Sequence, residues 1–277
     1  MKKILFPTDF SPAAANAFLY AHALAEALEA RIDVVHIFHL PVGDASNIPP
    51  EYIQKMLDEA EAETMQNLKE FSRPCLGKPT CGILLPVYGL FTAMEITDLA
   101  RQEHHDMIIM GTKGQRSALE KLLGSVTTEV MMKAPCPVLA IPADAVFTAV
   151  AHIAYATAFE PSDDHAVEQL MYLAGRLNAQ VHFVNVKTRT GDHLIREVKM
   201  EKDYRYNFAD LSEVHHNTVQ EGIDEFLQQR KMDWLTLFVP QRRLWERLFH
   251  SSLTKKMAYH SSIPLLVFHG NEKNGKF

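Results

Sequence analysis

The residues whose types and spacing most clearly suggest chemistry lie in the stretch MGTKGQRSALEKLLGS, positions 110–125. It contains Gly111, Gly114 and Gly124, with Ser125 after the last of them, although the chain has only 12 glycines in 277 residues. Because glycine lacks a Cβ, backbone N–H groups at these positions can approach ligand oxygens closely. A helix beginning at Gly124 and Ser125 would direct its free N–H groups and its positive dipole end toward an anion. We therefore predict a phosphate-binding loop.

A structural alternative explains the same glycines without a ligand. Two of them can form a turn and the third can cap a helix, because glycine is common after strands and at helix ends. The spacing alone is compatible with both interpretations.

The elements around this loop alternate between strands and helices, as apolar runs and amphipathic runs follow one another. Ser11 and Pro12 have the residue types of an N-cap and a first helical residue. The alternation indicates a parallel sheet covered by helices on both faces. Gly111 and Gly114 then lie at the carboxyl edge of the sheet, where such folds bind ligands. The predicted strands are 2–7, 32–40, 82–88, 106–111 and 137–142, and the predicted helices are 13–30, 50–72, 91–103 and 125–133.

The second half of the sequence repeats the first. An offset of 149 residues aligns HIAYATAFEP (152–161) with KILFPTDFSP, and AQVHFVNV (179–186) with ARIDVVHI. An offset of 127 aligns DWLTLFVPQ (233–241) with DMIIMGTKG, and IPLLVF (263–268) with CPVLAI. The second half therefore lacks about 22 residues, mainly from the loop and helix after its second strand.

This repeat predicts two tandem α/β domains, residues 1–143 and residues 150–270, each with a five-stranded parallel sheet. Duplicated domains of this size commonly pack as a pseudo-dimer, because an apolar strand at a sheet edge needs a partner. We expect the strand at 137–142 to pair with the strand at 264–269.

Composition and charge limit the classes of partner. The chain has 47% hydrophobic residues, 22% charged residues and a formal net charge of −6, which argues against nucleic acid or an anionic membrane as main partner. Three cysteines without C-x-x-C spacing favour packing roles and a cytoplasmic location over a disulfide framework. Pro7 and Asp9 interrupt the apolar start too early for a signal peptide, and we expect no membrane span.

The loop and its surroundings resemble the nucleotide-binding universal stress proteins. Residues 111–125 match that family's pattern G-x2-G-x9-G-[S/T]. ILFPTDFSPAA (4–14) resembles its first strand and turn, DVVHIF (33–38) its second strand, and GSVTTEVMMKAPCPVLAIP (124–142) its last helix and strand. The likeness covers the first half almost end to end and reaches the second half through the repeat. The chain is thus similar to tandem universal stress proteins, with Rossmann-like, adenine-nucleotide alpha-hydrolase-like domains.

The resemblance implies that the first domain binds ATP or another adenine nucleotide, with Mg²⁺. Asp9 would lie beside the adenosine, and the backbone of Ile37 would meet the adenine edge. Each residue also has a structural interpretation: Asp9 as a turn former, Ser125 as an N-cap, Lys113 as a solvated loop residue and Ile37 as core. The nucleotide-binding residues that the resemblance implies are Pro7, Thr8, Asp9, Ile37, Gly89, Met110, Gly111, Lys113, Gly114, Gly124, Ser125 and Val126.

The second half departs from this pattern. Its aligned residues carry side chains that restrict the loop, and a phenylalanine replaces the first glycine of the motif. We therefore expect one nucleotide per chain, and we infer that the three glycines serve the ligand rather than the fold. The aligned changes are Asp9 to Ala158, Gly89 to His216, Gly111 to Phe238, Gly114 to Gln241 and Gly124 to Ser251, while Thr157 and Ser252 keep the residue type.

Binding is favoured over catalysis, because ATP cleavage needs a placed base or water-orienting group and usually a held metal. Near the loop only Asp9, Ser125 and Thr127 offer such groups, and no G-x4-G-K-[ST] motif is present. We predict no catalytic residues and a nucleotide-dependent sensor or regulator of the stress response. The alternatives are a slow ATP hydrolase and a protein-interaction scaffold in which ATP only stabilises the fold. The sequence leaves a further homodimer and the protein partner undetermined.

Two features of the second half remain to be assigned. Its histidines lack the H-x3-H spacing of a metal site, so they are a weak signal for metal. The stretch RRLWERLFH (242–250) is amphipathic, which favours a helix or turn covering the sheet edge over a partner-binding or lipid-facing surface.

Overall fold

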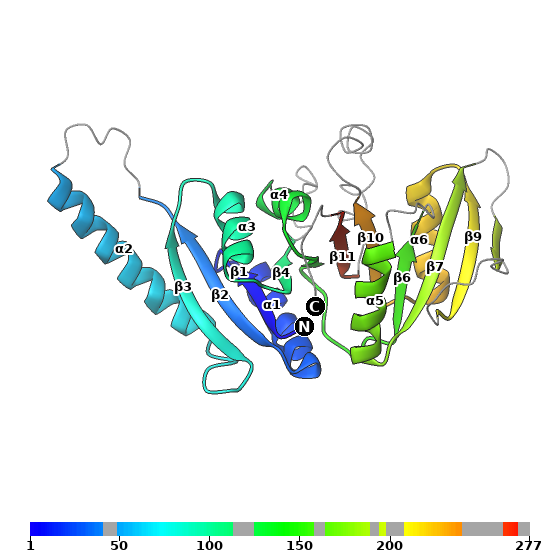
Figure 1. Cartoon of the computed structure of the whole chain (residues 1–277), viewed down its shortest axis with the longest axis horizontal. Helices are drawn as coiled ribbons and strands as arrows, with labels where there is room; N and C mark the ends of the chain where they lie inside the picture. The colour runs from blue at the N-terminus through cyan, green and yellow to red at the C-terminus, as the bar shows by residue number, and fades with distance from the viewer. Residues whose placement is uncertain are drawn as a thin grey trace.

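The protein forms one continuous sheet of 11 strands in the order β3-β2-β1-β4-β5-β11-β10-β6-β7-β9-β8 (Figure 1). The computed structural model describes residues 1–40, 49–112, 125–157, 164–188, 194–197, 208–239 and 263–270. All neighbouring strands in this sheet are parallel except the pairs β5–β11 and β8–β9. The predicted α/β fold with a mostly parallel sheet is confirmed.

The elements of the first half lie where the sequence predicts them, and each ends within two residues of its predicted limit. Ser11 is the N-cap of the first helix, because its side chain accepts a hydrogen bond from the N–H of Ala14 over 3.2 Å, and Pro12 is the first helical residue. The elements are β1 (Lys3–Pro7), α1 (Pro12–Leu28), β2 (Arg31–Phe38), α2 (Pro50–Phe71), β3 (Cys81–Tyr88), α3 (Thr92–Gln102), β4 (Met107–Gly111), α4 (Ser125–Lys133) and β5 (Val138–Ile141).

The second half builds its part of the sheet in the same strand order, with β6, β7, β9, β10 and β11 in the places of β1 to β5. The same hydrogen bonds start both halves: Asp106 Oδ2 accepts from the N–H groups of Lys2 and Lys3, and Asp233 Oδ2 from those of Ala151 and His152. The elements are β6 (His152–Ala156), α5 (Asp164–Leu177), β7 (Gln180–Thr188), β8 (Leu194–Glu197), β9 (Asp210–His216), α6 (Val219–Arg230), β10 (Trp234–Val239) and β11 (Leu265–His269).

The halves differ after their second strand. The sequence predicts that the second half lacks about 22 residues mainly at this place. The first half has the 22-residue helix α2, whereas the described part of the second half has β8, which pairs antiparallel with β9 at the sheet edge. The N-terminal end of α2 extends away from the sheet (Figure 1), and its buried residues are Thr64 and Leu68. The part of α2 that carries these buried residues packs on β2 and β3.

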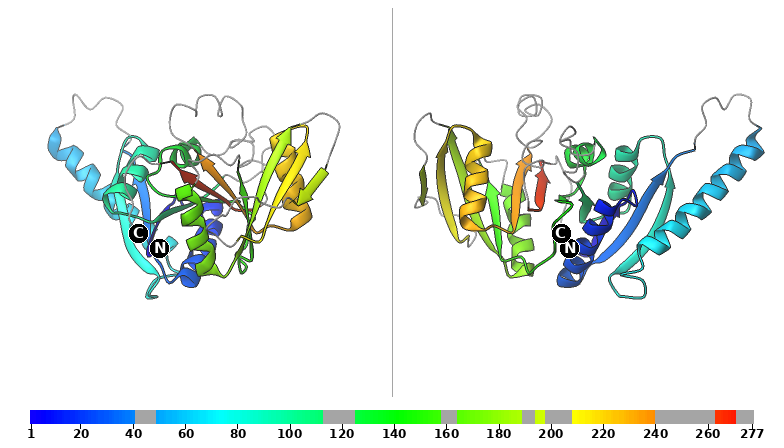
Figure 2. Two further views of the ribbon diagram at one scale, coloured as in Figure 1. Left: turned by 45° about the vertical axis from the view of Figure 1, so that its right-hand side comes forward. Right: turned by 180° about the vertical axis from the view of Figure 1, so that it is seen from behind.

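Two apolar layers enclose the sheet. Buried residues of α1 and α5, with Leu68 of α2, form the core on one face, and buried residues of α3, α4 and α6 form the core on the other. Figure 2 shows α5 in front of the sheet from one direction and α6 in front of it from behind. A parallel sheet buried on both faces explains why its strands are apolar runs rather than alternating patterns.

The two halves meet along β5 and β11, which pair antiparallel with Leu266 opposite Leu139. The predicted pairing of 137–142 with 264–269 is thus confirmed. A buried hydrogen bond also crosses between the halves, because Nε1 of Trp234 donates to the hydroxyl of Tyr20 over 2.7 Å. Burial raises the pKa of Tyr20 to about 12, so this hydroxyl stays neutral at physiological pH.

Candidate functional site

A cavity of about 610 Å³ opens at the carboxyl edge of the first half of the sheet. The ends of β1, β2 and β4 form its floor, and the N-terminal turns of α1, α3 and α4 surround it. Its size lies within the usual range for small-molecule sites. The lining residues are Pro7, Thr8, Asp9, Ser11, Ala13, Ala14, Val35, His36, Ile37, Phe38, His39, Thr92, Ile96, Met110, Gly111, Thr112, Ser125, Val126 and Thr127.

The structure brings eight of the twelve predicted binding residues together around this cavity. Gly89 is not among the lining residues, and Lys113, Gly114 and Gly124 lie outside the described residues. The role of each residue in binding a nucleotide stays a prediction. The eight that line the cavity are Pro7, Thr8, Asp9, Ile37, Met110, Gly111, Ser125 and Val126.

The turn after β1 is held by its own side chains. Asp9 Oδ1 accepts a hydrogen bond from the N–H of Ser11 over 3.0 Å, and Thr8 Oγ1 accepts one from the N–H of Phe10 over 3.0 Å. Phe10 adopts a left-handed conformation with φ of 59°. The turn-forming role of Asp9 is therefore real, and it leaves this exposed carboxylate at the wall of the cavity.

The N-termini of α1 and α4 lie at the same cavity. Ser11 and Ala13 of the α1 terminus, and Ser125 and Val126 of the α4 terminus, line it. The first turn of a helix carries N–H groups without intrahelical partners and the positive end of the helix dipole. Thr127 Oγ1 donates to the carbonyl of Gly111 over 3.2 Å, which fixes the start of α4 against the end of β4. The arrangement favours an anionic ligand group near α4.

Gly111 lies where β4 packs closely against α1. A Cβ at this position would lie 3.1 Å from the carbonyl oxygen of Ala13 and 3.3 Å from Cβ of Ala17, because β4 and α1 approach closely here. Gly111 therefore makes a close packing contact in addition to its predicted ligand role, because an added Cβ would require its neighbours in α1 to shift by a few tenths of an ångström. In the second half Phe238 occupies the aligned position and packs against the core.

His36 and His39 also line the cavity, although neither was among the predicted binding residues. Nδ1 of His36 lies 2.7 Å from the carbonyl oxygen of Thr8. A carbonyl oxygen only accepts hydrogen bonds, so Nδ1 carries the proton and a neutral His36 has its acceptor at Nε2. The pattern HIFH at 36–39 could have indicated such a contact, because a polar ring inside a buried strand needs a hydrogen-bond partner.

Gly89 contributes to the rim of the cavity indirectly. Nδ1 of His39 donates to the carbonyl of Gly89, and Nε2 of His39 lies 3.2 Å from Oγ1 of Thr92. A Cβ on Gly89 would overlap with the side chain of Glu95. The glycine thus lets the loop after β3 pack on α3, and His39 joins this loop to the end of β2.

At the corresponding edge of the second half, a different side chain makes a hydrogen bond to the equivalent backbone carbonyl. Nδ2 of Asn185 donates to the carbonyl of Thr157 over 2.7 Å, at the place where His36 donates to Thr8. His216, aligned with Gly89, lies 3.2 Å from a carboxylate oxygen of Glu221. The aligned positions Ala158, Gln241, Ser251 and Ser252, and the stretch 242–250, lie outside the described residues.

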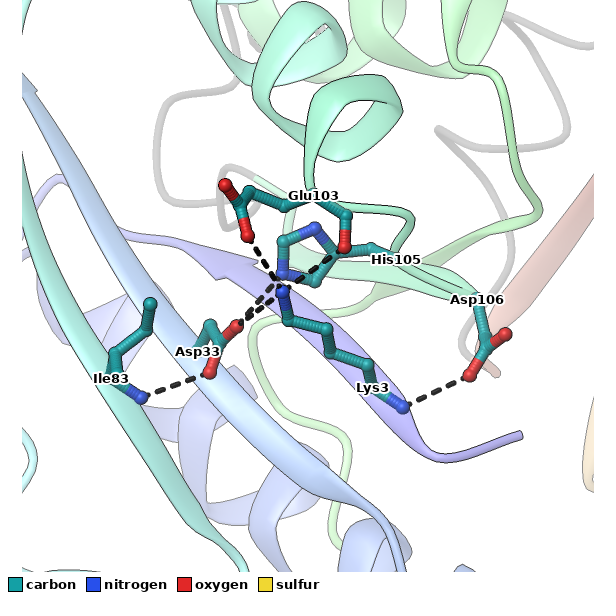
Figure 3. Close-up of polar contacts among 6 residues, drawn as sticks. All are labelled: Lys3, Asp33, Ile83, Glu103, His105 and Asp106. Carbon is teal, nitrogen blue, oxygen red and sulfur yellow. Dashed lines mark hydrogen bonds and ion pairs between the residues drawn. The ribbon is translucent and has the colours of Figure 1, made fainter.

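A buried charged cluster lies at the opposite, amino edge of the first half (Figure 3). Asp33, which is 1% exposed, accepts a hydrogen bond from the N–H of Ile83 over 2.9 Å. Its other oxygen lies 3.1 Å from Nε2 of His105 and 3.4 Å from Nζ of Lys3. Burial alone would raise the pKa of Asp33, but the hydrogen bonds and charges of its partners hold it below its usual value. The partners of Asp33 lie within the fold, and we assign this cluster a structural role.

The described ranges contain no group of three or more His, Cys, Asp or Glu residues placed to hold a metal ion. They also contain no helix long and apolar enough to cross a membrane.

The fold and the cavity together define an α/β protein with a cavity at the carboxyl edge of a parallel sheet. A family model described as the universal stress protein family matches residues 1–142, and the chain belongs to that family. A universal stress protein of Thermus aquaticus is 34% identical over 148 residues, which cover 50% of this chain and 98% of the relative. One of Methanocaldococcus jannaschii is 32% identical over 157 residues, covering 50% and 94% respectively.

A solved structure resembles the whole chain. A universal stress protein from Archaeoglobus fulgidus superimposes with a TM-score of 0.67, covering 98% of this chain and 97% of the other at 18% identity. The fold of both halves is therefore found in a protein of the same family. Another solved universal stress protein, in complex with cAMP, matches half of this chain at 20% identity and a TM-score of 0.39, covering 96% of that protein.

Proposed function

We propose that this universal stress protein binds ATP, or another adenine nucleotide, in the cavity of its first half and acts as a nucleotide-dependent sensor or regulator in the stress response. The observation that carries the proposal is the convergence of the α1 and α4 N-termini on one cavity at the carboxyl edge. In this proposal residues 1–143 and 150–270 are two domains of an intramolecular pseudo-dimer in the cytoplasm, and one nucleotide binds per chain.

The cavity offers different chemistry at its two ends, which suits the two parts of a nucleotide. At β2, the apolar side chains of Val35, Ile37 and Phe38 lie beside His36, a surface suited to a flat base. At α4, the N–H groups of Ser125 and Val126 in the first turn would suit phosphate oxygens. The base end would thus lie near the strands and the phosphates near the helix, with Lys113, Gly114 and Gly124 completing the phosphate end.

The residues that replace the predicted binding residues in the second half support a single ATP site per chain, in the first half. Phe238 takes the place of Gly111, and His216, paired with Glu221, takes the place of Gly89. Both side chains add volume where the first half has none. We therefore expect the second half to act as a scaffold or partner surface rather than as a second ATP site.

The site could hold Mg²⁺ even though it offers few protein ligands for the ion. Mg²⁺ commonly binds one or two carboxylates together with substrate phosphates and water. Asp9 is the carboxylate among the described lining residues, and the hydroxyls of Thr8, Ser125 and Thr127 line the same cavity. Asp9 would hold the ion, which would neutralise phosphate charge when the nucleotide is bound.

The same residues support binding rather than rapid hydrolysis. Asp9 is the lining carboxylate, and one of its oxygens already accepts the N–H of Ser11. A general base needs a free acceptor within reach of the attacking water, oriented by a further group. We therefore expect turnover of ATP by the purified chain to match that of an Asp9→Ala variant.

The decisive experiment measures nucleotide binding to the full-length chain by calorimetry, with mass spectrometry of the nucleotide released on heat denaturation. We expect about one ATP per chain. Ser125→Asp keeps a residue that suits a helix N-terminus but places a negative charge at the phosphate end, and two like charges about 5 Å apart weaken binding by roughly 100-fold. Ser125→Ala is the matched control and should change affinity much less.

Three results would contradict the proposal. Two equivalent ATP sites per chain would overturn the assignment to the first half. Unchanged ATP affinity in Ser125→Asp would overturn the phosphate site at α4. Unchanged partner binding by Ser125→Asp despite its weakened ATP binding would indicate a scaffold, because a nucleotide-dependent regulator would lose both.

A further inference from the structure

Two cysteines outside the cavity lie in direct contact. Cys75 is buried in the run of turns that follows α2, and Cys81 is the partly exposed first residue of β3. Their Sγ atoms are 3.1 Å apart, with the thiol of Cys75 as donor. Turns stabilise this arrangement, because the N–H of Lys78 donates to the carbonyl of Cys75 and the N–H of Cys81 to that of Lys78.

This distance is about 1 Å longer than a covalent sulfur–sulfur bond. A disulfide has a sulfur–sulfur length of about 2.0 Å, so the two sulfurs need to approach by roughly 1 Å. The segment between them contains Gly77, whose φ of +80° is a conformation that favours glycine, and it lies at the surface next to an edge strand. A turn of this kind can absorb a small movement without disturbing the core.

The two thiols differ in their environments. Burial raises the pKa of the Cys75 thiol to about 12, so Cys75 is protonated at neutral pH. Cys81 is partly exposed and is therefore the sulfur that a small oxidant reaches first. The third cysteine, Cys136, belongs to the core on the other face of the sheet, and burial raises its pKa to about 12 as well.

We propose that Cys75 and Cys81 are an oxidisable thiol pair that forms an intramolecular disulfide with an oxidant of the peroxide class. The Cys81 thiol loses its proton, the thiolate attacks one peroxide oxygen and the O–O bond breaks. Cys81 becomes a sulfenic acid, and the departing hydroxide takes up that proton and leaves as water. Cys75 then attacks the Cys81 sulfur, the S–S bond forms, and the sulfenic oxygen leaves as a second water with the Cys75 proton. Overall, two thiols and one hydrogen peroxide give one disulfide and two waters.

The disulfide would join the turn after α2 to the first residue of the edge strand β3. It would limit movement of the C-terminal end of α2, which packs on β2 and β3. The site lies at the amino end of β3, whereas the cavity lies at the carboxyl edge of the sheet. Oxidation and nucleotide binding are therefore separate properties, and each can be tested without the other.

The test treats the reduced full-length chain with hydrogen peroxide and maps its peptides by mass spectrometry without reduction. The expected product is a peptide that contains both Cys75 and Cys81 and has lost two hydrogens, while Cys136 keeps its thiol. A rise in melting temperature that dithiothreitol reverses should accompany it, because a cross-link restricts the unfolded chain.

Two variants resolve the order of the steps. In Cys75→Ser the sulfenic acid on Cys81 persists and is trapped by dimedone, whereas in Cys81→Ser neither a disulfide nor a dimedone adduct forms. Preferential oxidation of Cys136, cross-links between chains, or free thiols at both Cys75 and Cys81 after treatment of the wild-type chain would each overturn the proposal. The wild-type measurements keep it testable even if one variant fails to fold.

Discussion

Replacement of Asp33 by alanine removes the centre of the buried cluster at the amino edge of the first half. It leaves the N–H of Ile83 without its acceptor and the buried His105 without its carboxylate. Nδ1 of His105 already has no hydrogen-bond partner among the described residues, so the ring would lose its remaining one. Removing one partner of a buried ion pair costs about 3–5 kcal/mol, and a buried unsatisfied donor adds about 1–3 kcal/mol. We expect a loss of at least about 3 kcal/mol in the free energy of unfolding.

The measurement is urea denaturation of the full-length chain followed by circular dichroism. Asp98→Ala is the matched control, because Asp98 pairs with Arg101 over 2.6 Å on an exposed helix surface, and such pairs contribute at most about 1 kcal/mol. Asp33→Asn keeps the shape and one acceptor, so its loss should fall between those of the two alanine variants. Equal losses for Asp33→Ala and Asp98→Ala would refute the reasoning.

The contribution of Asp33 to the free energy of unfolding should depend on pH. Its partners hold the pKa of Asp33 below its usual value of 3.8 in the folded protein, so the unfolded chain binds this proton more readily. The stabilisation is therefore complete above the unfolded pKa and is lost as the pH falls through the folded pKa. The difference in unfolding free energy between wild type and Asp33→Asn should shrink below about pH 4. A difference that grows with acidification would contradict the assignment.

Three further substitutions test contacts elsewhere in the chain by the same urea titration. Gly111→Ala places a Cβ 3.1 Å from the carbonyl oxygen of Ala13 and should cost about 1–3 kcal/mol; an unchanged midpoint would disprove the packing role. Trp234→Phe removes the 2.7 Å hydrogen bond to Tyr20 between the halves and should cost about 1–3 kcal/mol, with the Tyr20→Phe background reducing that loss. Thr218→Ala removes the side-chain cap of α6 and should cost about 1 kcal/mol, whereas a loss near zero would show that the cap is dispensable.

The positions of the elements could be read from the sequence because they depend on local patterns. Apolar runs, the Ser11–Pro12 helix start and the recurrence of both halves each need only nearby residues or a fixed offset. The β5–β11 pairing was also predictable, since each half leaves an apolar edge strand that needs a partner. Most of the predicted binding residues gather at one cavity for the same reason: they follow strands whose carboxyl ends share one edge.

The remaining features required the tertiary structure, because they depend on residues distant in sequence. His36 and Thr8 meet only because β1 and β2 are neighbours, and the close approach of Gly111 to Ala13 depends on how α1 crosses β4. The contact between Cys75 and Cys81 depends on the path of a turn that no periodic pattern encodes. The sequence thus determined which elements form and in which order they pair, whereas tertiary packing decided which side chains face a ligand and which support the fold.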